Sequence, residues 1–217
     1  MPFSFDLTQL LTGFIALLIS LSVHEAAHAW AADRLGDDTA RMLGRLSINP
    51  AVHIDPIGTI VFPLVAMATN LPLIGWAKPV PVNPARLRPN WRQKFMLVAA
   101  AGPASNLVLA AAAALVLRVL APIEAGGDMV AISVANRLEY LFETMVFVNV
   151  LLAVFNMVPI PPLDGGNVLA GLLTGPLANT YDRLRPFGFV ILYGLMLTGL
   201  LTTIISPPAS LLLRFLL

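Results

Sequence analysis

Cysteine is absent from the 217-residue sequence, and charged residues make up only 12% of it. Without cysteine the chain offers no disulfide and no thiolate ligand, so any metal site must use histidine, carboxylate or backbone oxygen ligands. Soluble domains average about 25% charged residues, so this low content excludes an ordinary soluble domain. The formal net charge of +1 shows no excess of positive charge, and we expect no nucleic-acid partner.

Hydrophobic residues make up 58% of the sequence and gather in long segments. Four segments reach or exceed the roughly 20 residues that a helix needs to cross a bilayer. They cover residues 7–35, 94–120, 131–159 and 184–206. A fifth segment, 57–74, is shorter and interrupted by prolines, and residues 207–217 are too short to span and are expected to form an interfacial helix. The sequence therefore predicts an all-α polytopic membrane protein with four to six transmembrane helices.

The charges of the loops between these segments predict how the chain is oriented across the membrane. Residues 75–94 carry five basic residues and no acidic one, which places them in the cytoplasm by the positive-inside rule. Residues 33–55 mix charges of both signs and could lie on either side. If they too are cytoplasmic, both ends of 57–74 lie on one side of the membrane. We therefore favour a re-entrant or hairpin segment near 57–85 over a fifth span, with its backbone satisfied by protein or water.

The first apolar segment contains the motif H-E-x-x-H, formed by His24, Glu25 and His28. On a helix the two histidines are one turn apart and face the same way. They can then hold one zinc ion at about 2.0–2.1 Å, with Glu25 beside the metal as general base. The alternatives are a polar contact between helices and a chance match. Ionisable side chains are costly inside hydrocarbon, which favours the metal site over chance.

A catalytic zinc site needs a third protein ligand and an open position for water. The best candidate is Asp164, in an L-D-G-G turn that follows the prolines closing the 131–159 segment. Because that segment is predicted to run inward, Asp164 would return to the side on which the first segment ends. The alternative is a turn aspartate that bonds its own backbone. The turn alone is a weak signal, but its pairing with H-E-x-x-H favours a metal ligand.

Together these motifs resemble a known family. H-E-A-A-H at 24–28 and N-M-V-P-I-P-P-L-D-G-G at 156–166 are similar to the two signatures of the site-2 proteases, which are intramembrane zinc metalloproteases. The resemblance extends to G-P-A-S-N at 102–106 and to Asn83-Pro84, so it covers most of the chain. No interval between predicted spans can hold a PDZ domain, and the chain therefore resembles the small bacterial branch of the family.

This resemblance implies one zinc ion per chain, bound by His24, His28 and Asp164, with Glu25 as general base. It implies that residues 1–217 form a single integral-membrane peptidase domain in the cell membrane. The charge pattern orients its active site toward the cytoplasm. Substrates would be transmembrane segments of membrane proteins or peptides, either membrane-tethered regulators cut in regulated intramembrane proteolysis or remnant signal peptides.

Three asparagines are secondary candidates. Asn149 and Asn156 are seven residues apart and so lie on one helix face. Asn156 is a candidate catalytic residue that could bond the substrate backbone or the oxyanion, and an interhelical hydrogen bond explains it equally well. For Asn149 the interhelical bond is favoured. Asn106 follows Gly102 on a face of small residues, for which we favour helix packing.

His53 is the remaining histidine and precedes the 57–74 segment. It could be a fourth zinc ligand in a resting enzyme, a substrate contact or a histidine in a surface loop, and the last option is slightly favoured. Asp55 could orient its imidazole.

Residues 71–83 are expected to be extended, because prolines restrict both themselves and the residues before them. Near the zinc, such an edge could pair with an unwound substrate strand by β-augmentation. A rigid cytoplasmic linker anchored by Trp76 is equally compatible with the sequence. The basic residues that follow would lie near the anionic headgroups of the lipid bilayer.

The alternative function from another class is a non-proteolytic membrane protein that binds or transports metal. Glu25 discriminates between the two, since hydrolysis needs a base beside the ligands and transport does not. A transporter would also be expected to contain internal repeats, and the sequence contains none that we detect. Both observations favour the protease.

Overall fold

A computed structural model describes residues 7–61, 65, 77–126 and 128–217. Helices dominate these residues, which contain no β-strand, in agreement with the predicted all-α class. The elements in chain order are α1 (Leu7–Arg34), α2 (Thr39–Met42), the 3-10 turn η1 (Pro50–Val52), the π-helical turn η2 (Pro56–Val61), α4 (Trp91–Gly126), α5 (Met129–Asn156), α6 (Asp164–Leu172), α7 (Gly175–Leu184), the 3-10 turn η3 (Arg185–Phe187), α8 (Gly188–Leu197) and α9 (Leu200–Leu216).

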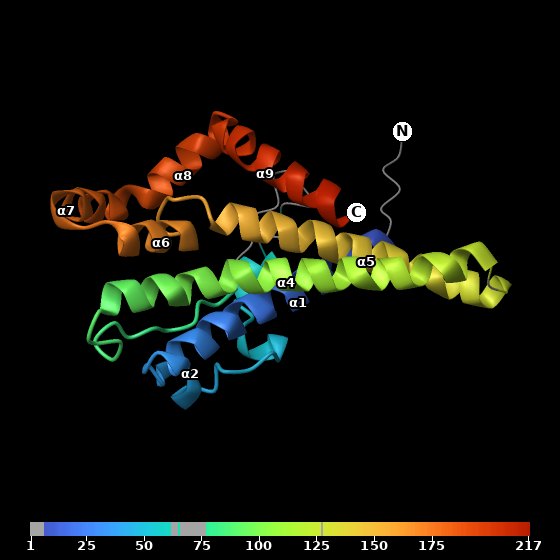
Figure 1. Cartoon of the computed structure of the whole chain (residues 1–217), viewed down its shortest axis with the longest axis horizontal. Coiled ribbons are helices and arrows are strands. Elements are labelled where there is room, and N and C mark those ends of the chain that lie inside the picture. The colour runs from blue at the N-terminus through green and yellow to red at the C-terminus, as the bar shows by residue number, and fades with distance from the viewer. Residues whose placement is uncertain (1–6, 62–64, 66–76, 127) are drawn as a thin grey trace.

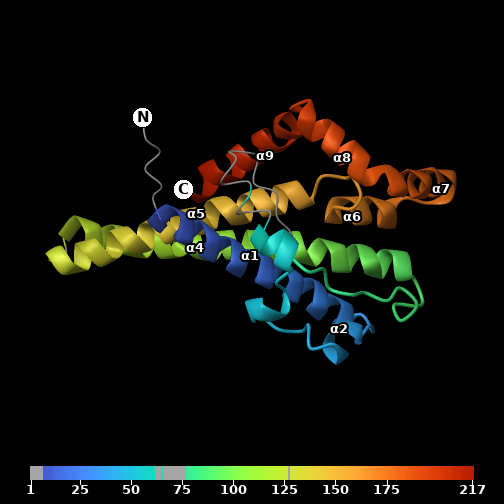
Figure 2. The same ribbon diagram turned by 180° about the vertical axis from the view of Figure 1, so that it is seen from behind.

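Three helices, α1, α4 and α5, are long and apolar enough to cross a membrane. They match the predicted spans 7–35, 94–120 and 131–159, although α4 extends to 36 residues and α5 already ends at Asn156. Figure 1 and Figure 2 show α4 and α5 lying side by side, with α1 packed against them. The predicted multi-pass membrane bundle is thus confirmed.

Small side chains line the contact between these three helices. The almost completely buried positions include Ala16 of α1, Ala110, Ala113 and Ala114 of α4, and Val146 of α5. Lipid tails are as apolar as these side chains, so the spans associate through close van der Waals packing and interhelical hydrogen bonds. The alanines bring the backbones close together, and polar side chains buried in the same contact can then bond across it.

The predicted fourth span, 184–206, is wrong as one continuous helix. α8 ends at Leu197 and α9 begins at Leu200, and the helical stretch 175–197 meets α9 at 80°. Gly199 between them has φ +74°, a left-handed conformation that ends helices and that glycine adopts without strain. The residues on both sides are apolar, so hydropathy alone does not reveal the break.

The final residues also differ from the prediction. The chain forms no separate interfacial helix over 207–217 but continues α9 from Leu200 to Leu216, with Pro207 and Pro208 in its interior. Figure 1 shows α9 returning over α5, against which it packs. The described residues therefore contain three candidate spans, or four if the bent helices cross as one.

Much of the predicted re-entrant or hairpin segment, residues 62–64 and 66–76, lies outside the described residues. Among the described residues that flank it, the backbone N–H of Lys78 donates to the carbonyl of His53 at 2.8 Å. The re-entrant course of 57–74 stays a prediction.

A labelling experiment tests this topology. Asp38, just after α1, forms an ion pair with Arg86 of the basic loop, so the two residues lie at the same membrane surface. The chain has no cysteine, so single cysteines at these positions can be probed with a membrane-impermeant maleimide. We expect both to label from the cytoplasm and a cysteine at Asp128, between α4 and α5, to label from the other side. Labelling of positions 38 and 86 from opposite sides would contradict the fold.

Candidate metal centre

The C-terminal half of α1 positions two imidazoles inside the helix bundle. His24 and His28 lie one turn apart, as the unbroken helix requires, and are 5% and 9% exposed. Their Nε2 atoms are 3.0 Å apart, and their rings meet nearly at right angles. One helix therefore supplies two nitrogen donors that point at a common position.

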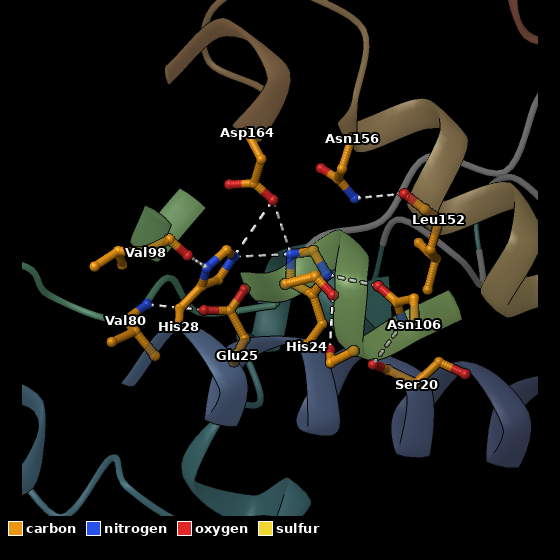
Figure 3. Close-up of polar contacts among 12 residues, drawn as sticks. Ser20, His24, Glu25, His28, Val80, Val98, Asn106, Leu152, Asn156 and Asp164 are labelled. Carbon is orange, nitrogen blue, oxygen red and sulfur yellow. Dashed lines mark hydrogen bonds and ion pairs between the residues drawn. The ribbon is translucent and has the colours of Figure 1, made fainter. Parts of the chain in front are cut away.

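Asp164 brings a carboxylate to the same position from the far end of the chain. Its Oδ2 lies 3.1 Å from Nε2 of His24 and 3.3 Å from Nε2 of His28 (Figure 3). Asp164 is the first residue of α6, which packs on α4 beside the histidines. Among the described residues, these three side chains form a group that could hold a metal ion.

The turn before α6 is built so that Asp164 can reach the histidines. Gly165 and Gly166 lie so close to the preceding backbone that a Cβ on either would collide with it, on Met157 and near Pro161 respectively. The hydroxyl of Tyr181 in α7 donates to the carbonyl of Gly166 at 3.0 Å. Gly165 and Gly166 therefore permit the tight turn, and the hydrogen bond from Tyr181 stabilises it.

One face of α4 holds both imidazoles in place. Val98, Gly102 and Asn106 recur at every fourth residue and so lie along this face. The Val98 carbonyl is 2.7 Å from Nδ1 of His28, and the Asn106 Oδ1 is 2.6 Å from Nδ1 of His24. A Cβ on Gly102 would lie 2.5 Å from the His28 ring and 2.6 Å from the His24 ring, so only glycine leaves room for them.

These contacts fix which ring nitrogen carries the proton in a neutral imidazole. A carbonyl oxygen can only accept, so neutral His28 donates its Nδ1–H to Val98 and has its lone pair on Nε2. Asn106 presents its amide oxygen to His24 in the same way. Two Nε2 lone pairs then face a carboxylate oxygen of Asp164 that is buried and receives no hydrogen bond. Such a set of acceptors repels itself unless a cation lies between its members, and its nitrogen and oxygen donors fit zinc.

Comparison with known proteins identifies the family. A model of the family described as "Peptidase family M50" matches residues 12–197. The chain belongs to peptidase family M50. The "Putative zinc metalloprotease YwhC" of Bacillus subtilis is 36% identical over 193 residues, 89% of this chain and 83% of that protein. The "Putative zinc metalloprotease Rip2" of Mycolicibacterium smegmatis is 32% identical over 184 residues, 83% of this chain and 64% of that protein. No solved structure matches the chain.

The family assignment confirms the resemblance to site-2 proteases and the expected Zn²⁺ cofactor. Both relatives carry the words "zinc metalloprotease" in their names, and the two nitrogens and one oxygen brought together here suit that metal. The M50 chain is therefore a zinc metalloprotease whose described residues include one cluster with the expected ligand chemistry.

Glu25 lies beside this cluster and is held by a distant backbone group. Its Oε2 accepts the N–H of Val80 at 2.9 Å, as Figure 3 shows. Val80 stands between Pro79 and Pro81 in the segment 77–83, which forms no strand. The expected substrate-pairing edge therefore uses one of its few backbone donors to orient Glu25.

The two asparagines of α5 have separate surroundings. Asn156 is half-buried on the Asp164 side of the site, and its Nδ2 donates to the Leu152 carbonyl at 3.0 Å (Figure 3). Asn149 is completely buried and bonds Asn106 across the helix contact, in agreement with the interhelical role we favoured. Asn106 itself was interpreted from sequence as a packing position, whereas it contacts His24 directly.

The structure keeps His53 apart from the metal-ligating group, although its side chain is buried. Its Nε2–H donates to the Ser47 carbonyl at 2.7 Å, and its own carbonyl receives the N–H of Lys78. Asp55 does not orient the imidazole in the described contacts, because its Oδ1 instead accepts from Ile57 and Gly58. These bonds give His53 a role in ordering its own loop.

Replacing Gly102 with alanine should displace the imidazoles. The added Cβ would meet both rings, so we expect zinc affinity to fall by about 10- to 100-fold, the range seen when the supports of metal ligands are disturbed. Gly13→Ala in α1 is the matched control, because its Cβ would meet nothing within 4 Å. Competition with a chromophoric chelator measures both variants, and unchanged affinity in Gly102→Ala would contradict the assigned packing.

Proposed function

We propose that this M50 chain is an intramembrane zinc metalloprotease with His24, His28 and Asp164 as ligands of one zinc ion per chain and Glu25 as general base. The observation that carries the proposal is the approach of two imidazole Nε2 atoms and a carboxylate oxygen to 3.0–3.3 Å of one another. We further propose that residues 1–217 act as a single integral-membrane peptidase domain.

Hydrolysis of a peptide bond needs an activated water, a polarised carbonyl and a proton for the leaving nitrogen. A zinc ion, when bound, supplies Lewis acidity toward the carbonyl and makes water a stronger acid. The Glu25 carboxylate takes the proton of the attacking water and delivers it to the amide nitrogen as the C–N bond breaks. The N–H of Val80 bonds Oε2 of Glu25 and so orients the carboxylate that carries this proton.

The depth of the site supports cleavage within the membrane. His24 lies ten residues before Arg34, or about 15 Å along α1 from its polar end. The basic loop is fastened to that end, where Lys94 Nζ donates to the Leu35 carbonyl at 3.1 Å. Since the positive-inside rule assigns this loop to the cytoplasm, we propose that the active site faces the cytoplasmic side of the cell membrane.

The proposed substrates are transmembrane segments of membrane-tethered regulators or of remnant signal peptides. A helical segment hides its carbonyls in its own hydrogen bonds, so it must unwind before hydrolysis. We assign to Asn156, half-buried beside Asp164, the hydrogen bond to the substrate backbone or the oxyanion. The enzyme would thus serve regulated intramembrane proteolysis or signal-peptide clearance.

Glu25→Gln separates catalysis from metal binding. The amide keeps the size of the side chain and removes the base, so we expect kcat on a transmembrane peptide to fall at least about 100-fold. Zinc content should stay at about one per chain, because Glu25 is no ligand. The measurements are peptide cleavage in detergent micelles and zinc content by atomic absorption.

Glu143→Gln, on an exposed part of α5, is the matched control and should retain both cleavage and zinc. Normal turnover by Glu25→Gln would remove Glu25 from catalysis. Zinc binding without any cleavage by the unaltered protein would favour a metal carrier instead.

A further inference from the structure

A network of buried polar side chains joins the three spanning helices behind His24. Ser20 of α1, Asn106 of α4 and Asn149 of α5 are each 0% exposed. Their hydrogen bonds form a continuous chain that ends at Nδ1 of His24. Buried polar groups of this kind are costly unless every partner is satisfied, so the direction of each bond is constrained.

A backbone carbonyl at the end farthest from His24 sets the donor and acceptor directions in this series of hydrogen bonds. Asn149 Nδ2 lies 2.8 Å from the Met145 carbonyl, which can only accept, so the NH₂ group must point there. The same nitrogen lies 2.8 Å from Ser20 Oγ, whose own proton goes to the Ala16 carbonyl. The amide oxygen of Asn149 is thereby turned toward Asn106.

The orientation of the Asn149 amide in turn determines how the Asn106 amide faces the imidazole of His24. Its Nδ2 donates to Asn149 Oδ1 at 2.8 Å and makes a longer bond of 3.3 Å to the Ser20 carbonyl. Its Oδ1 is left facing His24 Nδ1 at 2.6 Å. A neutral His24 then carries its proton on Nδ1, and its Nε2 has the lone pair that a metal needs.

We propose that Asn149 is a positioning residue for His24: it orients the Asn106 amide and through it selects the imidazole tautomer that leaves Nε2 free. This inference rests on the proposed function, in which His24 is a zinc ligand. Without Asn149, the Asn106 amide keeps only the longer Ser20 bond to set its orientation. A turned amide would present NH₂ to Nδ1, which moves the ring proton to Nε2 and blocks the metal.

His28 provides an internal comparison. Its Nδ1–H donates to the backbone carbonyl of Val98, which cannot turn around. The tautomer of His28 therefore depends on no side chain, whereas that of His24 depends on two. Loss of Asn149 should therefore change the tautomer of His24 and leave the Nδ1–H of His28 in place.

The first test is nitrogen NMR on the zinc-free protein labelled with ¹⁵N-histidine. The chain contains three histidines, so the ring signals can be assigned with single substitutions. In the unaltered protein we expect His24 to carry its proton on Nδ1. In Asn149→Leu, which has a similar volume and no polar atom, we expect the Nε2–H form of His24 to appear. His28 should keep its proton on Nδ1, bonded to Val98, as evidence that the bundle is folded.

The second test is zinc affinity by chelator competition. Asn149→Leu should bind zinc about tenfold more weakly, the lower end of the range for outer partners of metal ligands. Asn149→Asp should recover most of that loss, since an aspartate keeps an acceptor oxygen facing Asn106 in either protonation state. Thr144→Val is the matched control on the same helix, because the Thr144 hydroxyl donates to the Tyr140 carbonyl of its own helix and lies outside the network.

The outcomes separate the inference from the function on which it rests. Equal zinc affinity and an unchanged His24 tautomer in Asn149→Leu would overturn the positioning role while leaving the zinc site intact. Failure of Asn149→Asp to restore affinity, with His28 still protonated on Nδ1, would also overturn it. If instead the unaltered protein bound no zinc through His24, the proposed function itself would fail.

Discussion

The structure depends on the approach of three candidate ligand atoms to one another in an apolar bundle. Two come from one turn of α1, and the third comes from Asp164, 136 positions after His28. No donor is held by its own helix alone: α4 supports both imidazoles, and the tight turn before α6 delivers the carboxylate. The spanning helices therefore keep the two Nε2 atoms and the carboxylate oxygen close together, an arrangement that a bound cation stabilises.

The close contact of the three spanning helices also explains why polar residues are tolerated deep in the bundle. A buried amide in hydrocarbon is costly when unpaired, and each amide behind His24 has its donors and acceptor matched. The small residues of α1 and α4 bring the backbones close enough for these bonds to close. Packing and chemistry are thus coupled, because the contact that joins the helices also determines the state of a candidate ligand.

Much of this arrangement could be predicted from the sequence. H-E-x-x-H fixes the spacing of His24 and His28 through helix geometry, and the apolar context makes chance matches costly. Asp164 followed from the need for a third ligand near a helix break. The partners on α4 could not be found in this way: the Val98 carbonyl has no side-chain signature, and the role of Asn106 depends on how two helices meet. The break at Gly199 was missed because hydropathy does not register backbone conformation.

The central claim is that Asp164 completes the metal site with the two histidines. In a chain without cysteine, Asp164→Cys places the only sulfur able to act as a thiolate ligand at that position. X-ray absorption at the zinc edge distinguishes a Zn–S distance of about 2.3 Å from nitrogen or oxygen at about 2.0–2.1 Å. We expect a sulfur shell around the zinc in Asp164→Cys and none in Thr144→Cys. Zinc bound by Asp164→Cys with an unchanged nitrogen and oxygen shell would contradict the assignment of Asp164 as a ligand.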